Sequence, residues 1–376
     1  MSLVSHLYFG QLGEWCEDRM TGSLAMAQRV AEATRGTEKV RPAGRVTRRH
    51  WSQTDRAFSI RMSSLVQPAP PYSALYGLVR VGLVSRDWAH RQAGLYPTHI
   101  HLKETDRSHA LDLRPTVSGW LDLESEHSVQ RYLRSDGSPL YGSFTDVSVE
   151  PMLSDLFNRI RAYFGMHAPL GQVGAEKGLV RLCWLLAKLE YIFRNEVTND
   201  PVYRMFSDGK PTVEQLYAAA DEASVNELVE LVRLLHSSGS LNEMRTLAGN
   251  PPLGRPWGIA RPVFNSYWAD HDLLIGGQDG TTLVDVNSVS KTNNSTRSRR
   301  WIWRLLCCAW LDSEDAYRIR NVAMYFSRYG SLVTWPVEEL ALELFEGEDP
   351  EDTRHEFLGL VQQLREEDRR ARPREA

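Results

Sequence analysis

The sequence lacks the hallmarks of several large protein classes. Its four cysteines, Cys16, Cys183, Cys307 and Cys308, do not have the paired spacing of a zinc site, so we expect buried, reduced thiols. No apolar run reaches the roughly eighteen residues that a transmembrane helix needs. Neither a GxxxxGKS/T loop nor a GxGxxG turn is present, so an ATP- or NAD-driven activity has no support.

Two further absences concern location and charge. The N-terminus has no basic region followed by a long apolar stretch, so we expect no signal peptide, no membrane and a cytoplasmic location. The net charge of −4 excludes a uniformly basic chain. Basic residues are instead concentrated between residues 28 and 62, whereas residues 338–351 are strongly acidic.

Apolar residues at three- and four-residue spacing dominate the first part of the chain, which is typical of amphipathic helices. We expect helices over residues 1–35, 151–166, 174–195, 212–220 and 224–235, and a pair of helices over 73–93. Residues 36–72 are polar, basic and then Pro-rich, which predicts a loop or a β-like excursion.

Residues 94–145 alternate and break often, which predicts two or three short strands. His99 and His101 share one face of such a strand, with Glu104 and His109 nearby, so a metal-dependent enzyme built on these residues is one alternative. A solvated strand face is the simpler interpretation, because no further ligand completes the set.

A β-hairpin is predicted over residues 272–286. Gly276, Gly277 and Gly280 make a reversal inexpensive, and the returning segment is rich in β-branched residues. The pairing places Asp272 and Asp285 near matching ends of the two strands. Two carboxylates on adjacent strand ends can share a hard cation such as Mg²⁺ or Mn²⁺.

The hairpin is followed by a basic segment, an apolar helix over residues 301–311 and strands over 321–327 and 331–335. The order of strand, acid, hairpin, acid, helix and two strands resembles the core of the PD-(D/E)XK, or restriction-endonuclease-like, nucleases. In this resemblance Asp272 matches the first acid and Asp285 the second. Asn287 stands where the family has its lysine.

The resemblance implies two carboxylates that hold one or two Mg²⁺ ions and a nearby positive charge. Lys291, four residues beyond Asn287, is the candidate for the displaced charge, and Asp270 is a second candidate for the first acid. The family often adds an acid from a preceding helix. The candidates for that acid are Glu227, Glu230 and Glu243.

The sequence therefore predicts an α/β protein. A mainly helical N-terminal region covers residues 1–250, with the short β excursion near 94–145. A restriction-endonuclease-like mixed-sheet core covers 251–346, and a charged helical or disordered tail covers 347–376.

The resemblance implies a Mg²⁺-dependent nuclease, with phage defence or DNA repair as settings known for this fold by analogy. The alternative is a catalytically degenerate relative that binds nucleic acid or serves as a scaffolding subunit in a complex with protein partners. The expected nucleic acid is DNA rather than RNA. Its predicted phosphate contacts are Arg45, Arg48, Arg49, Arg297, Arg299, Arg300 and Arg304.

Overall fold

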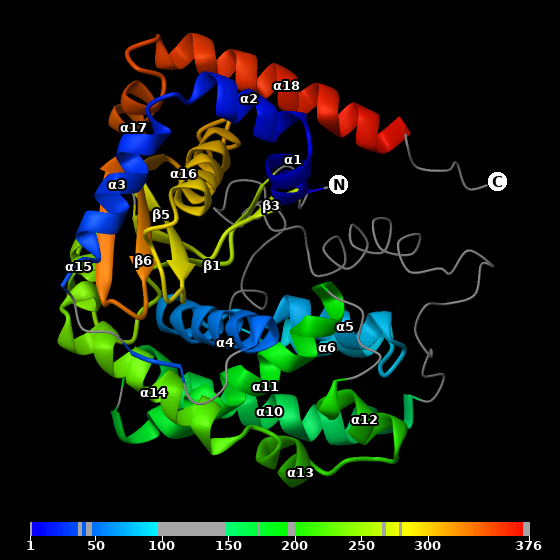
Figure 1. Cartoon of the computed structure of the whole chain (residues 1–376). Coiled ribbons are helices and arrows are strands. Elements are labelled where there is room, and N and C mark those ends of the chain that lie inside the picture. Colours follow the sequence, from blue (N-terminus) through cyan, green and yellow to red (C-terminus); the bar gives the residue numbers. More distant parts are fainter. Residues whose placement is uncertain are drawn as a thin grey trace.

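The computed structural model describes residues 2–36, 40–42, 47–96, 147–171, 173–194, 200–264, 268–277 and 280–370. It confirms the predicted fold class, because a helical N-terminal region is followed by an α/β part with a mixed five-stranded sheet (Figure 1). None of the helices in these ranges has the length and apolar character that crossing a membrane requires. The β excursion predicted near 94–145 lies almost entirely outside the described residues.

The N-terminal segment forms three helices rather than the one helix predicted over residues 1–35. They are α1 (Leu3–Phe9), α2 (Gln11–Arg19) and α3 (Ser23–Ala33). The chain bends at Gly10 and again around Gly22, where the backbone N–H donates to Leu344 O at 3.1 Å. A Cβ at Gly22 would lie 1.9 Å from Glu343 O, so only glycine permits this close approach.

Most of the remaining helices of the N-terminal region lie in the predicted ranges, but α12 and α15 were not predicted. Helices α5 (Tyr72–Arg80) and α6 (Arg86–Gly94) form the expected pair. After the short turn η2 (Val147–Val149) come α10 (Glu150–His167), η3 (Ala168–Leu170), η4 (Val173–Ala175), α11 (Glu176–Arg194), α12 (Pro201–Ser207), α13 (Val213–Ala218), α14 (Glu222–Ser237) and α15 (Ser240–Leu247). Thr212 and Gln215 form a capping box at α13, and Asp221 caps α14.

The segment 36–72 contains a long helix, α4 (Arg48–Val66), which corrects the predicted loop or β-like excursion. Thr47 caps the start of this helix, because its side chain accepts from His50 N. The polar composition of this segment did not indicate a buried helix, because several of its polar side chains are buried against specific partners. Gln53 donates to Trp184 O at 2.8 Å, and Arg61 forms a fully buried ion pair with Glu176 at 2.6 Å.

The five-stranded sheet has the order β1-β4-β5-β6-β7. Its strands are β1 (Gly258–Ala260), β4 (Leu273–Gly277), β5 (Gly280–Asn287), β6 (Ile319–Phe326) and β7 (Ser331–Pro336). The pair β4–β5 is the predicted hairpin, and β5 runs parallel to β6 through the crossover helix α16 (Ser295–Trp310). Strands β2 (Val263–Phe264) and β3 (Ala269–Asp270) form a small separate sheet.

Helices cover both faces of the sheet (Figure 1). One face packs on α4 and the helical body beneath it through Leu273, Ile275, Val284, Val286, Ala323 and Tyr325. The other packs on α16, α1–α3, α17 (Val337–Leu344) and α18 (Pro350–Arg370) through Leu274, Leu283, Val322, Met324 and Phe326. Each core draws on residues from both sides of position 250, so the predicted division there does not separate two cores.

The two ends of the described chain lie together along α18. His6 of α1 contacts Asp368 at 3.0 Å, and Trp15 of α2 donates to Glu356 at 2.7 Å. Helix α18 lies in the segment 347–376, for which a charged helical or disordered tail was predicted.

Candidate functional site

Asp272 and Asp285 both lie at the open end of the β4–β5 hairpin, where Asp272 contacts α4 and Asp285 contacts α16. Asp272 directly precedes β4, one step beyond the last register pair, which places it opposite Asp285 of β5. Its Oδ1 accepts from Ser59 Oγ of α4 at 2.5 Å, and its Oδ2 accepts from Val286 N at 3.0 Å. The first acid is therefore held by both the sheet and α4.

Asp285 is the most enclosed carboxylate of the site, with 2% of the residue exposed. Its Oδ2 accepts from Asn287 Nδ2 at 2.7 Å, because residues two apart on a strand share a face. Its Oδ1 lies 3.4 Å from Arg304 Nη1 of α16 and 3.7 Å from His271 Nε2. Asn287 thus contacts the second acid but brings it no charge.

A third carboxylate, Asp55, comes from α4 and was not predicted. Its Oδ1 accepts from Ser288 N, just after β5, at 2.7 Å. Burial raises the pKa of Asp55 to about 6, and the charges of Asp272 and Asp285 add to this effect while Ser288 and Arg56 oppose it. We call these three carboxylates, from three segments of the chain, the acidic centre.

Two arginines balance part of this negative charge. Burial lowers the pKa of Arg304, but Asp285 and other neighbours outweigh it and hold that pKa above its ordinary value. Burial likewise raises the pKa of Asp272, but Arg304 and Arg56 outweigh it and hold that pKa below its ordinary value. Arg304 also donates to Asp270 O at 3.1 Å. The positive charge beside the second acid therefore comes from α16.

His271 does not point away from the site, as the alternation of a strand would suggest. Its Nδ1 lies 3.1 Å from Val284 O, and because a carbonyl only accepts, Nδ1 carries the proton and donates. Burial lowers the pKa of His271, so its Nε2 presents a lone pair. That nitrogen is buried without a hydrogen-bond partner in the described part of the chain, and it faces Asp285.

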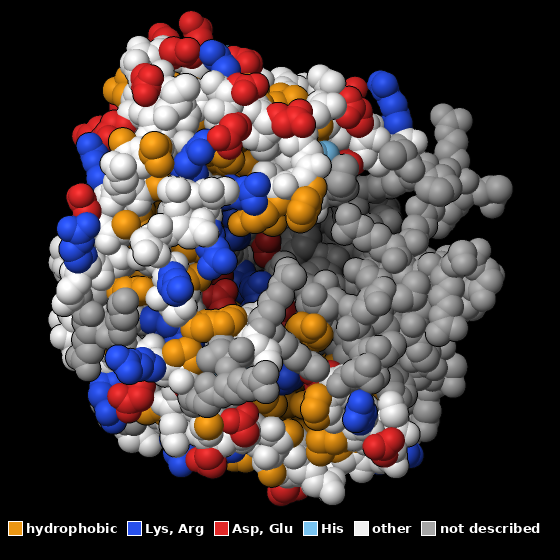
Figure 2. Space-filling view, in the orientation of Figure 1, with side chains coloured by type: hydrophobic (Ala, Val, Ile, Leu, Met, Phe, Trp, Pro, Cys, Tyr) orange, Lys and Arg blue, Asp and Glu red, His pale blue; other side chains and the backbone are white. Residues whose placement is uncertain are grey.

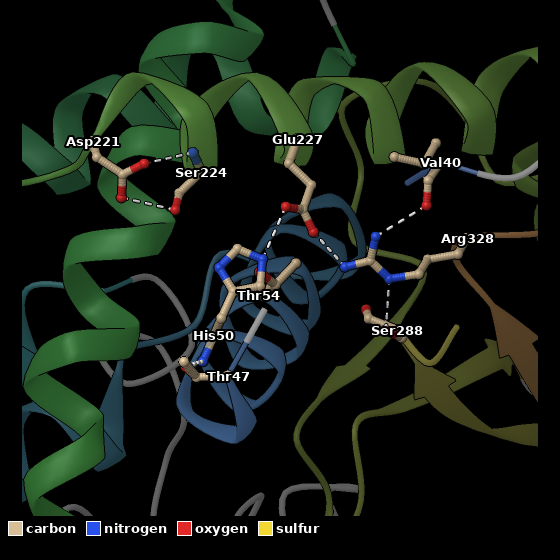
Figure 3. Close-up of polar contacts among 9 residues, drawn as sticks. All are labelled: Val40, Thr47, His50, Thr54, Asp221, Ser224, Glu227, Ser288 and Arg328. Carbon is tan, nitrogen blue, oxygen red and sulfur yellow. Dashed lines mark hydrogen bonds and ion pairs between the residues drawn. The ribbon is translucent and has the colours of Figure 1, made fainter. Parts of the chain in front are cut away.

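Glu227, a candidate for the upstream acid, has a different role (Figure 3). Its Oε1 is paired with Arg328 Nη2, and its Oε2 lies 2.9 Å from His50 Nε2. Arg328 is fully buried and also donates to Ser288 O at 2.9 Å. This network ties the start of α4 to the segment after β5, and it leaves Glu227 without access to the acidic centre.

The other predicted acids also lie elsewhere. Glu230 contacts Arg233 on the exposed face of α14 at 2.8 Å, and Glu243 is exposed on α15. Asp270, the second candidate for the first acid, lies 3.6 Å from Arg261. The carboxylate that a preceding helix brings within electrostatic range of Asp272 and Asp285 is Asp55 of α4.

The predicted basic residues fall into several environments. Arg45 lies outside the described residues, as do the side chains of Arg48 and Arg49 and the group His99, His101, Glu104 and His109. Arg297 is exposed at the start of α16. Lys291 is exposed as well, and no described residue forms a hydrogen bond or ion pair with it. Arg304, rather than Lys291, contacts the second acid.

Two arginines of α16 are engaged with other helices. Arg299 contacts Glu17 at 2.5 Å and lies over the ring of Trp303 at 5.1 Å. Arg300 lies over the ring of Tyr8 at 4.9 Å. The view in Figure 2 shows a hollow in which acidic side chains lie beside Lys and Arg side chains.

Some of the side chains at the acidic centre are suitable ligands for a divalent cation. Asp272 and Asp285 supply hard oxygen ligands, and the orphaned imidazole nitrogen of His271 is a donor that Mn²⁺ also accepts. In the described ranges, however, no three Asp, Glu, His or Cys side chains surround one point as a complete metal site does. Asp55 lies within electrostatic range of the pair without completing such a set, so a cation here would use the two hairpin acids together with water.

Comparisons of the chain with family models, with curated proteins and with solved structures gave no match. The fold and the site define an α/β protein with a mixed five-stranded sheet and a carboxylate-rich centre at the end of its central hairpin.

Proposed function

We propose that this protein is a nuclease of the PD-(D/E)XK type that hydrolyses DNA phosphodiesters with Mg²⁺ or Mn²⁺. The observation that carries the proposal is that Asp272, Asp285 and Asp55 lie within electrostatic range at the end of the hairpin where the resemblance requires acids, and that Arg304 lies within range of both hairpin acids. The order of helix, three strands, crossover helix and parallel strand supports the same assignment.

The residues have distinct roles in this proposal. Asp272 and Asp285 hold the cation, which when bound lowers the pKa of a water molecule and stabilises charge on the phosphoryl oxygens. Asn287 fixes the Asp285 carboxylate, and Arg304 supplies the positive charge that the family takes from lysine. The low pKa of Asp272 keeps that ligand ionised at neutral pH.

The proposed substrate enters along the face that carries the acidic centre. Lys291 and Arg297 are exposed between the end of β5 and the first turn of α16, where they are available to phosphates. We propose a cytoplasmic protein of DNA repair or phage defence, alone or with protein partners. DNA binding through these residues should weaken steeply with salt, because phosphate contacts release counterions.

A second candidate function rests on the contacts of Asp285. Asn287 and Arg304 already engage both of its oxygens, so the carboxylate is balanced without a metal. This observation favours a degenerate nuclease fold that binds nucleic acid or organises a complex without cleaving.

The deciding experiment is titration calorimetry with Mg²⁺ and Mn²⁺, run beside a cleavage assay on linear and single-stranded DNA. The test variant combines Asp272→Asn with Asp285→Asn, which preserves size and hydrogen-bonding capacity. The control combines Asp208→Asn with Asp352→Asn, two exposed aspartates whose loss changes the net charge equally. Metal binding and cleavage that vanish only in the test variant support the nuclease.

Asn287→Lys separates the two candidate functions. If the wild type binds DNA but neither binds metal nor cleaves, and Asn287→Lys gains cleavage, the site is a degenerate one that lacks only its lysine. If neither protein binds metal, both acids are structural and the nuclease proposal fails.

A further inference from the structure

A cavity of about 350 Å³ is lined in part by Glu190, and none of its described lining residues belongs to the acidic centre. It is bounded by the end of α4, the start of α5, the C-terminal part of α10 with η3, and the residues around β1. Most of its wall is apolar or aromatic, including Ile60, Pro70, Tyr72, Tyr96, Ile160 and Phe164. Its volume lies at the lower end of the range of about 300–1,000 Å³ that is usual for small-molecule sites.

Arg161 gives this apolar cavity a positive charge. The only hydrogen bond of Arg161 to a described residue is from Nη2 to Asn158 Oδ1 at 3.3 Å, and no described residue forms an ion pair with it. Its Nε is buried and unpartnered. Burial raises the pKa of Tyr96 and the Arg161 charge counteracts this, which indicates that the guanidinium lies near the phenol.

The other charges in the wall are already balanced. Glu190 contacts Arg56 at 3.2 Å and Arg261 at 2.8 Å. Arg261 in turn reaches Asp270 at 3.6 Å. Among the described lining residues, Arg161 is therefore the charge without an acidic partner.

A buried hydroxyl supplies a second polar contact. Ser63 of α4 lines the cavity and is 7% exposed, and its Oγ has no hydrogen-bond partner in the described part of the chain. A buried polar atom left unpaired is costly, so such an atom in a cavity wall indicates a missing partner.

We propose that this cavity binds a small molecule with an apolar ring system and one anionic group. The rings contact the prolines and aromatic side chains, Arg161 binds the anion, and Ser63 donates to a polar atom of the rings. The site is separate from the acidic centre, and the proposal does not depend on the nuclease activity.

The test uses two fluorescent probes with the same kind of ring system. 8-Anilinonaphthalene-1-sulfonate carries an anion, and N-phenyl-1-naphthylamine has the same rings without the sulfonate. We expect one-to-one binding of the sulfonate by the full-length protein. Arg161→Gln should weaken that binding about tenfold or more, because a charge-assisted contact is lost, and should leave the neutral probe nearly unchanged.

Two further variants keep the test decisive. Arg159→Gln removes an exposed arginine of the same helix, which contacts Asp155 and Glu214, and should not change either affinity. Gly165→Leu places a side chain at the cavity wall, where a Cβ meets nothing within 4 Å, and leucine also favours the helix. This variant should abolish binding of both probes while the protein stays folded.

Several outcomes would overturn the proposal. Equal weakening by Arg161→Gln and Arg159→Gln would mean general attraction to surface charge. Sulfonate binding that survives Gly165→Leu would mean adsorption elsewhere, and no binding of either probe would remove the site altogether.

Discussion

At the residue scale, Asp55 is a carboxyl group of the acidic centre whose ionisation the fold disfavours. Its carboxyl group is fixed by Ser288 N while two other carboxylates lie close by. Its pKa of about 6 exceeds the ordinary value of 3.8. The folded protein therefore binds this proton more tightly than the unfolded chain does, and the stabilisation it gives is lost as the pH rises from about 4 to above 6.

The prediction concerns the pH dependence of the free energy of unfolding. Between pH 4 and pH 7 the wild type should lose up to about 3 kcal/mol relative to Asp55→Asn, which cannot ionise but still accepts from Ser288. Urea denaturation at several pH values measures the difference. Burial lowers the pKa of His271, an effect of opposite sign that both proteins share and that cancels.

Asp208→Asn, at an exposed position, is the control and should give a difference that does not change with pH. A flat difference for Asp55→Asn as well would show that neither burial nor the neighbouring carboxylates raise the pKa of Asp55.

The sequence predicts only part of this site. Asp272 and Asp285 are found because thirteen residues and a glycine turn bring them together locally. Asp55 lies more than two hundred residues earlier, and Arg304 on the next helix, so their contacts depend on tertiary packing that no local pattern encodes. His271 faces Asp285 because the chain leaves β3 before β4 begins, which breaks the alternation of side chains that a continuous strand would have.

At the element scale, α4 connects the sheet to the helical body. Its Ser59 contacts Asp272, while Arg61, half a turn further on, is buried against Glu176. Helix α4 was not predicted from the sequence because the helix buries polar groups on several sides and does not present one apolar face. Helices α11 and α18 were predictable for the opposite reason, since their apolar residues recur with the helical period.

The start of α4 is held by the pair of Arg328 and Glu227, which gives a prediction for this element. Arg328→Met alone removes the buried positive charge that is paired with Glu227, and should cost about 3–5 kcal/mol of unfolding free energy. Adding Glu227→Leu removes the negative charge that Arg328→Met leaves buried without its arginine. The double variant should regain at least about 2 kcal/mol of the unfolding free energy lost in the single variant. Urea denaturation of the single and double variants measures this recovery.

The exposed pair of Arg233 and Glu230 is the matched control. Arg233→Met should cost less than about 1 kcal/mol. A double variant less stable than Arg328→Met would show that Glu227 contributes through its other contacts rather than as a stranded charge.

At the scale of the whole molecule, the two cores join sequence regions that looked separable. Trp257 and four residues of the β4–β5 hairpin pack with α4 and α11, while α1–α3 pack with α16 and α18. The break near residue 250, with its prolines and glycines, indicated a domain boundary, but it is a connection within one packed structure. A segment rich in proline and glycine indicates a break in regular secondary structure. It does not indicate whether the residues before and after the break pack against one another.

The corresponding prediction concerns fragments. Residues 251–376 expressed alone would expose the apolar face that α4 covers, and should show no cooperative thermal transition by circular dichroism. Co-expression with residues 1–250 should restore both the transition and co-purification of the two pieces. A cooperative transition of the C-terminal piece alone at the midpoint of the full chain would contradict this view.

The contacts of α18 with α1 and α2 also have a mechanical consequence. His6 and Asp368 join the first helix of the chain to the last, and Trp15 and Glu356 repeat this link two turns or more away. Tension applied between the two ends is therefore borne first by the interface of α18 with α1 and α2, before any strand of the sheet is loaded. A pulling experiment should detach these terminal helices as the first event, at an extension too short to involve the acidic centre.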